Sequence, residues 1–329
     1  MTNSNQERKV YFNGDFVKES EAKISIYDSA LMFGDMVFEM TRSFNGEQFK
    51  LREHIKRLLT GIKIFRIPLE ETEDSIYEKC LLTIDQNKGE FKDDDEHRLM
   101  IDVSRGLLDI YKGVDGLHKE ANLIIADFPL RWTVKSMGIL FDQGINAFIS
   151  SQRAIPARYL DPKIKNRSRV FYLMANIEAA QVRYPNTWAL MLDDDGYITE
   201  GTGDNFFIIK DGVVITPEGR NILRGISRDY VIYELCKELK LECVQKNIEP
   251  YDVYNADEAF MTGTPFCMLP VTSLNELQIG SGERGPIFNL ILKKWSENIG
   301  LDIESQIKSW DEGNNDKNIG TSPYQFSKK

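Results

Sequence analysis

The sequence predicts an α+β protein of two domains. The chain has 329 residues, of which 42% are hydrophobic and 28% are charged, so it is long enough to bury a large core and is most simply divided in two. Two Asn-Gly pairs, Asn13-Gly14 and Asn45-Gly46, separate short apolar runs and predict β-hairpins. In other stretches apolar residues recur at helical spacing, which predicts amphipathic helices that cover a core.

The composition argues against several functional classes. There are 41 basic and 51 acidic residues, which gives a net charge of -10 and no long basic run, so binding to nucleic acid or an anionic membrane is disfavoured. The four cysteines form no CxxC pair and there are three histidines, so neither a zinc site nor a disulfide framework is expected. The polar start of the chain and the lack of a long apolar run predict a cytoplasmic protein with no membrane segment.

The first domain is predicted to span residues 1–130. Its expected elements are hairpins over 10–17 and 37–51, helices over 51–67 and 70–88, and strands over 98–104 and 121–130. Side chains alternate along a strand, so we expect Phe38, Met40 and Arg42 on one face of the second hairpin. Glu39 and Thr41 are then expected on the opposite face.

The second domain is predicted to span residues 139–305, after an interdomain linker over 131–138. We expect two strands over 138–153, a helix from Val170, a strand from Trp188 to Leu192 and a hairpin turned at Asp211-Gly212. Helices are expected after residue 226 and over 282–300. Residues 306–329 are polar and are predicted to form a loosely packed extension.

The stretch LDPKIKNRSRVFYLMANIE, residues 160–178, contains the lysine that we expect to be catalytic. Lys165 precedes an apolar helical pattern whose first turns carry no acidic residue. A lysine that is desolvated beside other cations holds a free amine, which can form a Schiff base with an aldehyde. The chemistry alone does not choose between Lys165 and Lys163.

Four blocks of the sequence resemble the class IV aminotransferases, which are pyridoxal-phosphate enzymes of fold type IV. The blocks are YDSALMFGDMVFEMTRSFNGEQFKLREHIKRL, DPKIKN, GYITEGTGDNFFIIKDGVVITP and ILRGISRD, in the family's order. The resemblance runs from about Lys9 to Ile303. It implies two α/β domains with the cofactor site between them, and a homodimer.

The resemblance also implies a role for individual residues. Lys165 would form the Schiff base with pyridoxal 5'-phosphate and carry the proton between substrate and cofactor. Glu200 would contact the pyridine nitrogen and keep it protonated. The cofactor phosphate would be bound by a cation, by the start of a helix and by a hydroxyl, namely Arg57, Ile226 with Ser227, and Thr264.

The expected reaction is a ping-pong transfer of an amino group from an amino acid to a 2-oxo acid. Arg42 corresponds to an arginine near the substrate carboxylate in branched-chain aminotransferases, which favours a branched-chain L-amino acid as donor. The remaining candidate substrate residues are Phe38, Met40, Lys112 and Arg153.

Two departures from the branched-chain pattern leave other substrates open. Met40 stands where these enzymes usually have Gly, and Val170 stands where they have a Tyr, with Tyr172 two residues later. Ile110 and Lys112 stand where the D-amino-acid enzymes hold a carboxylate with an Arg and a His, which counts against that standard carboxylate site, although Lys112 is a candidate substitute cation. DPKIKN and the GPI segment at Gly285 nevertheless resemble the amine and D-amino-acid branches. An amine or D-amino-acid transaminase, an aminodeoxychorismate lyase and a cofactor-binding protein without turnover are therefore alternatives.

Overall fold

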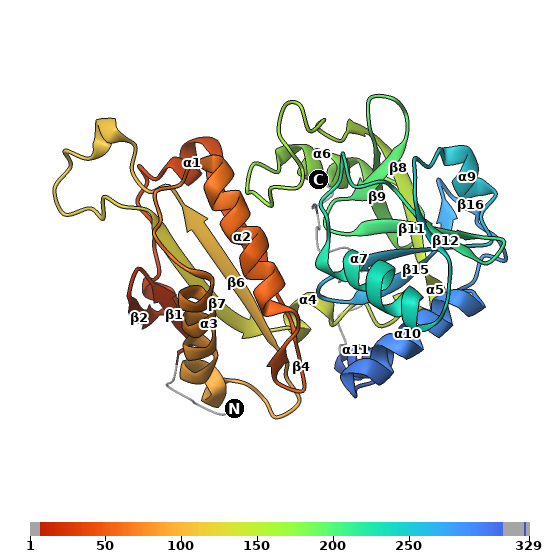
Figure 1. The fold of residues 1–329 in the computed structure, drawn as a ribbon, viewed down its shortest axis with the longest axis horizontal. Helices are drawn as coiled ribbons and strands as arrows, with labels where there is room; N and C mark the ends of the chain where they lie inside the picture. The colour runs from red at the N-terminus through yellow and green to blue at the C-terminus, as the bar shows by residue number, and fades with distance from the viewer. Residues whose placement is uncertain (1–6, 312–325, 327–329) are drawn as a thin grey trace. The chain divides into compact units, whose positions relative to one another are not determined.

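The computed structural model describes residues 7–311 and residue 326, and it divides into two compact units (Figure 1). Unit 1 contains the described residues up to Trp132 together with Ile164–Arg169. Unit 2 contains Thr133–Lys163 and the described residues from Val170 onward. The chain thus returns to unit 1 for the lysine segment, which the sequence analysis assigned to the second domain. Local patterns do not reveal this return, because the segment is held by backbone hydrogen bonds to a strand more than 100 residues earlier.

Unit 1 is an antiparallel sheet with two long helices on one face (Figure 1). The strand order is β2 (Asp15–Lys18), β1 (Lys9–Phe12), β7 (Asn122–Pro129), β6 (His97–Ser104) and β3 (Met36–Met40). The helices are α2 (Leu51–Phe65) and α3 (Glu73–Asn87), and both positions confirm the prediction. Thr72 caps α3, since its side chain accepts a hydrogen bond from Ser75 N.

The core of unit 1 lies between α2, α3 and the sheet. Alternate residues of β6, namely Leu99, Ile101 and Val103, are fully buried, and they belong to one cluster with Ile55 and Leu58 of α2. Buried residues therefore recur at every second position on the strand and at every third or fourth position on the helix, as the sequence indicates.

Both predicted Asn-Gly turns of unit 1 are present. All four turn residues have positive φ, from 51° at Asn13 to 107° at Gly14, as a tight hairpin turn requires. The second turn joins two short strands, β4 (Ser43–Phe44) and β5 (Glu47–Gln48), which start after β3 has ended. The other short elements of unit 1 are α1 (Ser29–Phe33) and the 3-10 turns Glu19–Glu21, Lys88–Glu90 and Asp109–Tyr111.

Unit 2 is built on one large mixed sheet. Its order is β10 (Ile198–Gly201), β9 (Thr187–Leu192), β8 (Ile145–Arg153), β15 (Cys267–Leu274), β14 (Glu258–Gly263), β11 (Asn205–Lys210), β12 (Val213–Thr216) and β13 (Cys243–Gln245), with β16 (Leu277–Gln278) on β15. β10 also pairs with β11, so six strands form a closed ring. The predicted strand over 188–192 and the hairpin at Asp211-Gly212 are confirmed.

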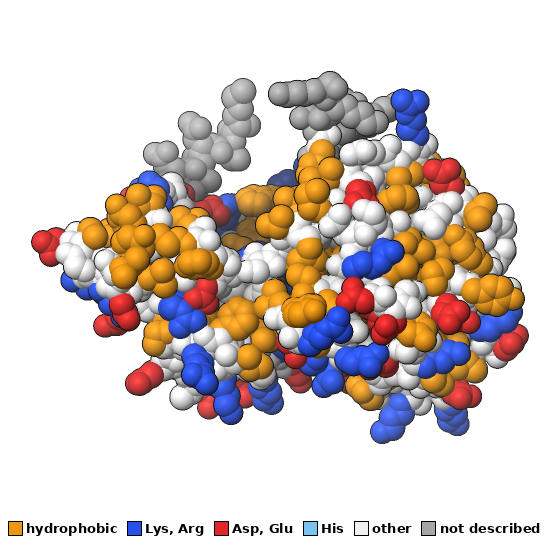
Figure 2. All heavy atoms as spheres, turned by 90° about the horizontal axis from the view of Figure 1, so that it is seen from above, with side chains coloured by type: hydrophobic (Ala, Val, Ile, Leu, Met, Phe, Trp, Pro, Cys, Tyr) orange, Lys and Arg blue, Asp and Glu red, His pale blue; other side chains and the backbone are white. Residues whose placement is uncertain are grey.

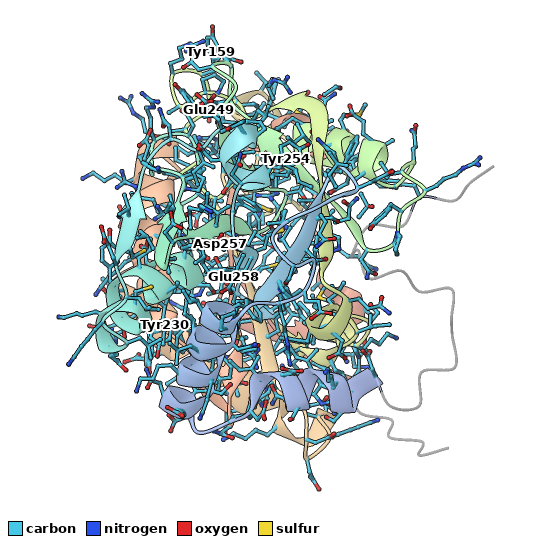
Figure 3. The ribbon with its side chains drawn as sticks, turned by 90° about the vertical axis from the view of Figure 1, so that its right-hand side faces the viewer. Tyr159, Tyr230, Glu249, Tyr254, Asp257 and Glu258 are labelled. Atoms are coloured by element: carbon cyan, nitrogen blue, oxygen red, sulfur yellow. The ribbon has the colours of Figure 1, made fainter. Side chains whose placement is uncertain are left out.

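Several helices pack on this sheet, among them α5 (Leu140–Gln143), α6 (Val170–Ala179), α7 (Ile226–Tyr230) and α10 (Pro286–Ile299). The other helices of unit 2 are α8 (Cys236–Glu238), α9 (Pro250–Tyr254) and α11 (Ile303–Asp311), with a π-helical turn at Val231–Leu235, and α4 (Arg131–Val134) spans the boundary between the units in the sequence. Glu258 at the start of β14 accepts hydrogen bonds from Ile287 N and Phe288 N, at 3.0 and 2.8 Å, and so ties α10 to the sheet (Figure 3).

Two predictions for unit 2 were wrong. Residues 140–143 form α5 rather than a strand, because Gly144, at a φ of 73°, ends a single helical turn there. The first six residues of the predicted extension belong to α11, whose side chains Ile303, Ile307 and Trp310 are buried at helical spacing. Residues 312–325 and 327–329 of that extension lie outside the described residues.

The described helices include none that is long and apolar enough to cross a membrane. On the face shown in Figure 2, basic and acidic side chains alternate over the surface. Positive charge on that face is therefore dispersed rather than gathered in one patch.

Candidate active site

Strand β3 positions the candidate residues of unit 1. Glu39 faces α2, because its carboxylate contacts His54 and Arg57 on that helix. Phe38 faces the other side, where its ring contacts the lysine segment. The predicted alternation is therefore correct for these residues. It does not extend to Arg42, because β3 ends at Met40.

The lysine segment lies along the open edge of β3. Phe38 N donates to Lys165 O at 3.0 Å, and Arg167 N donates to Met36 O at 2.9 Å. Ile164 is buried in the core of unit 1, and the next residue of an extended segment points the opposite way. The Lys165 side chain accordingly lies with Phe38, and its Nζ is 4.8 Å from the centre of the phenyl ring.

The competing lysine, Lys163, has different surroundings. It belongs to unit 2, where its Nζ lies 2.7 Å from an Asp161 carboxylate oxygen and donates to Arg220 O at 3.1 Å. These two oxygen atoms hold the Lys163 amine beside Asp161 and Arg220. The structure thus distinguishes two lysines that the sequence alone did not.

Arg57 is fixed to β3 by a buried carboxylate. Glu39 is fully buried, and its two oxygens accept from Arg57 Nε at 2.6 Å and from Arg57 Nη2 at 2.8 Å. His54 Nδ1 lies 2.7 Å from the same carboxylate. Burial by itself would raise the pKa of Glu39, but the charges and hydrogen bonds of Arg57 and His54 outweigh burial and hold that pKa at about 2. Burial lowers the pKa of His54 despite the carboxylate beside it.

Sequence reasoning predicted Arg57 but missed Glu39 and His54 as its partners. The HxxR spacing was the available signal, since residues three apart lie on one face of a helix. The bidentate contact fixes the plane of the Arg57 guanidinium, whose side chain is 15% exposed.

Glu200 is the corresponding buried acid of unit 2. It is 4% exposed and accepts hydrogen bonds from Tyr172 Oη at 2.7 Å, Asn205 Nδ2 at 3.0 Å and Leu223 N at 3.0 Å. Tyr172 reaches it from α6, whereas Val170 is 70% exposed. Tyr172, seven residues after Lys165, therefore contacts the candidate acid Glu200.

Asn205 connects Glu200 to the start of α7, where Ile226 and Ser227 lie. Its Nδ2 also donates to Leu223 O at 2.8 Å. A Cβ on Gly225, the residue before α7, would come within 2.1 Å of Asn205 Oδ1, so only glycine permits this close approach. Ser227 is buried in the first turn of α7.

Thr264 lies in the short loop between β14 and β15 and is half-buried. Two residues earlier, Thr262 is 1% exposed and its hydroxyl has no hydrogen-bond partner in the part of the chain that the structure describes. Thr262 is the direct neighbour of Asn205 across β14 and β11, so both side chains lie on one face of the sheet. Sequence reasoning missed Thr262.

The remaining candidate substrate residues lie in varied environments. Arg42 is 1% exposed, donates to Ser43 O and lies 3.8 Å over the ring of Phe44. Met40 is half-buried, and Arg98 Nη2 lies 3.6 Å from its sulfur.

Two of the candidate cations are exposed. Lys112 forms an ion pair with Asp109 at 2.6 Å. Arg153, in unit 2, donates to the carbonyl oxygens of Ser150 and Ser151. Their observed partners therefore come from their own local segments.

Comparison with known proteins identifies the family. The model of the class IV amino-transferase family matches residues 36–274. The branched-chain-amino-acid aminotransferase of Escherichia coli (strain K12) is 34% identical over 288 residues, which are 84% of this chain and 88% of that protein. The D-alanine aminotransferase of Bacillus licheniformis is 31% identical over 280 residues, 85% of this chain and 93% of that protein.

Solved structures agree. The crystal structure of the Escherichia coli branched-chain amino acid aminotransferase is 30% identical, with a TM-score of 0.79, and covers 90% of this chain and 95% of its own. The branched-chain amino acid aminotransferase from Thermobaculum terrenum, in its pyridoxal-phosphate holo-form, is 27% identical, with a TM-score of 0.76, and covers 92% of this chain and 97% of its own. The chain has fold type IV and belongs to the class IV aminotransferases, a family of pyridoxal-phosphate-dependent enzymes.

Proposed function

We propose that this aminotransferase moves an amino group between a branched-chain L-amino acid and a 2-oxo acid, with Lys165 as its catalytic residue. The observation that carries the proposal is the position of the Lys165 amine beside Phe38, while Lys163 is paired with Asp161. The names of the relatives in the comparison supply the donor class.

The residues present fit pyridoxal phosphate. A buried carboxylate, Glu200, suits a protonated ring nitrogen, and the first turn of α7 offers backbone N–H groups to a phosphate. The buried Thr262 hydroxyl without a described partner lies on the same sheet face as Asn205, which itself binds Glu200. A further polar group at this face would satisfy that hydroxyl.

The cofactor residues that we propose come from both units. Lys165 and Arg57 belong to unit 1, and Glu200, Ile226, Ser227 and Thr264 belong to unit 2. When bound, pyridoxal phosphate would supply an electron-accepting ring that stabilises the charge left when the substrate loses its α-proton.

Each proposed residue has a defined task. Arg57, held in plane by Glu39, would bind the phosphate, and Glu200 would keep the ring nitrogen protonated. The Nζ of Lys165 would take the proton from the substrate's α-carbon and pass it on to the cofactor, and it would carry a proton in the opposite direction in the second half of the cycle. The Phe38 ring covers one side of this amine and limits its contact with water.

The similarity to a D-alanine aminotransferase favours a D-amino acid as the second candidate donor. Arg42, Met40, Lys112 and Arg153 stay proposals as substrate residues. We propose in addition that the enzyme is a homodimer in the cytoplasm, as the family resemblance implies, and light scattering of the purified protein would test the dimer.

Covalent trapping tests the role of Lys165. The protein would be loaded with pyridoxal phosphate, reduced with borohydride, digested and mapped by mass spectrometry. We expect the label on Lys165, its loss in Lys165→Ala and its retention in Lys163→Ala. Label on Lys163, or none, would contradict the proposal. A panel of L-leucine and D-alanine, read by bleaching of the visible cofactor band, would decide the donor.

A further inference from the structure

Arg167 is a cation that the sequence analysis did not single out. It lies on the face of the unit 1 sheet that Phe38 occupies, opposite the face covered by α2 and α3. It follows Lys165 by two residues in an extended segment, so the two side chains lie on the same face. Its Nε and Nη2 both donate to Asp102 Oδ1, at 3.1 and 2.8 Å. Its guanidinium carbon Cζ lies 3.7 Å from the centre of the Phe38 ring.

Two strands support this guanidinium. Phe38 on β3 and Asp102 on β6 are direct neighbours across the sheet, so the ring and the carboxylate lie side by side beneath it. Both are buried, at 4% and 7% exposed. A planar guanidinium held by a carboxylate on one edge and stacked on an aromatic face has little rotational freedom, so its orientation is fixed before any ligand arrives.

The remaining edge of the guanidinium is available to a ligand. The Arg167 side chain is 32% exposed, and its Nη1 makes no hydrogen bond to the described part of the chain. A guanidinium carries five N–H donors, and the contacts with Asp102 use two of them. The free edge is suited to a planar anion such as a carboxylate.

This edge is close to the reactive amine. The distances of Lys165 Nζ and Arg167 Cζ from the same ring centre are 4.8 and 3.7 Å, so the two groups are at most 8.5 Å apart. In an amino acid, the α-carboxylate carbon is about 2.5 Å from the amino nitrogen, and a bidentate contact places it about 4 Å from a guanidinium carbon. These two lengths add up to about 6.5 Å, a separation that the upper limit of 8.5 Å allows between the reacting amine and Arg167.

We propose that Arg167 binds the α-carboxylate of the amino donor and of the 2-oxo acid, and so selects amino acids over simple amines. Asp102 is its positioning residue. The inference rests on the proposed function, since it takes Lys165 as the reacting group. It assigns the carboxylate to a cation that differs from Arg42, which is buried against Phe44.

Two donors that differ by the carboxylate test this inference. L-leucine and 3-methylbutylamine share the side chain and the amino group, and only the first carries the α-carboxylate. Bleaching of the cofactor band in single turnovers would give the half-saturating concentration of each donor. For Arg167→Gln we expect the value for L-leucine to rise about tenfold to a hundredfold, and the value for the amine to stay unchanged.

A matched variant and a carboxylate probe complete the test. Arg169 carries the same charge, with its Cζ 5.8 Å from the Phe38 ring, and we expect Arg169→Gln to leave both donors unchanged. Binding of 4-methylpentanoate, which has the carboxylate but no amine, should weaken by the same factor in Arg167→Gln. The paired change Arg167→Met with Asp102→Asn removes both charges, and it should show the same loss while keeping the melting temperature.

The outcomes separate the two proposals. If the wild-type protein forms no visible cofactor band, the proposed function fails and this inference fails with it. If the band forms but Arg167→Gln binds 4-methylpentanoate as the wild type does, this inference alone is wrong. An equal loss for L-leucine and the amine, or the same loss in Arg169→Gln, would also overturn it.

Discussion

Two buried glutamates, one in each unit, are stabilised in different ways. Glu39 accepts hydrogen bonds from Arg57 and contacts His54, so its charge is balanced by a guanidinium. The three donors to Glu200 described above are a phenol, an amide and a backbone N–H, all of them neutral. These donors stabilise the carboxylate without cancelling its charge.

The difference predicts two kinds of function. Glu39 acts inside the protein, because its charge serves to hold Arg57 against β3. We propose that Glu200 acts on a ligand, because a buried carboxylate can stabilise a cation such as a protonated ring nitrogen. Changing Glu39 should therefore affect stability first, and changing Glu200 should affect catalysis first.

The largest effect is expected for Glu39→Ala. This substitution leaves the Arg57 and His54 side chains without their buried carboxylate, and removal of one partner of a buried pair costs about 3–5 kcal/mol. The free energy of unfolding from denaturant titration would measure it. The control is Glu53, an exposed acid on α2, the helix that carries His54 and Arg57. Glu53→Ala should change the free energy of unfolding little. Equal losses in the two variants would remove the distinction.

Glu200→Gln should reduce the rate at which L-leucine converts the bound cofactor by about a hundredfold to a thousandfold. The substitution removes the negative charge that we propose to lie beside the ring nitrogen of pyridoxal phosphate. The melting temperature should change little, since the amide oxygen can replace Oε2 and accept from Asn205 and Leu223, while the amide NH2 can donate to the Tyr172 hydroxyl. Single-turnover bleaching of the cofactor band gives the rate. A variant with wild-type rates would refute the assigned role, and Glu283→Gln, at an exposed position, is the control.

Acid should act on Glu39 in a defined direction. Its pKa is about 2 in the folded protein and near 4.5 without the fold, so the unfolded state binds the proton more tightly. This stabilisation is fully present above pH 4.5 and is lost as the pH falls from 4.5 toward 2, by about 3 kcal/mol in total. Unfolding titrations through that window should show a slope that Glu39→Gln lacks. An identical slope in the variant would contradict the assignment.

The smallest effect is expected for Tyr172→Phe. It removes one hydrogen bond to the Glu200 carboxylate, worth about 1.5 kcal/mol for a charged acceptor. The unfolding free energy should fall by that amount, and Tyr184→Phe, at a 40% exposed position, should not change it. A loss of the same size when Tyr172→Phe is combined with Glu200→Ala, which removes the polar partner, would show that the tyrosine acts elsewhere.

Much of the fold could be predicted from local patterns. The Asn-Gly turns, the helical stripe of α2 and the alternation of β3 each involve neighbours in sequence, and all three are confirmed. The helix α5 was mistaken for a strand because a short apolar run has no clear period. The helical start of the predicted extension was missed because its overall polarity concealed the three buried residues of α11.

Contacts distant in sequence could not be predicted. Glu39 meets Arg57 and His54 across a strand and a helix, and Asp102 meets Arg167 across 65 residues. Neither pairing leaves a periodic trace in the sequence. The candidate Lys165 came from a family motif, whereas its separation from Lys163 required the pairing of the lysine segment with β3.

The most direct test of the account is to follow the amino nitrogen itself. L-leucine with an isotope-labelled amino group would be incubated with 2-oxoglutarate, the enzyme and pyridoxal phosphate, and glutamate would be analysed by mass spectrometry. We predict labelled glutamate from the wild type and none from Lys165→Ala. If the wild-type enzyme keeps its cofactor band but forms no labelled glutamate, the proposed function is wrong.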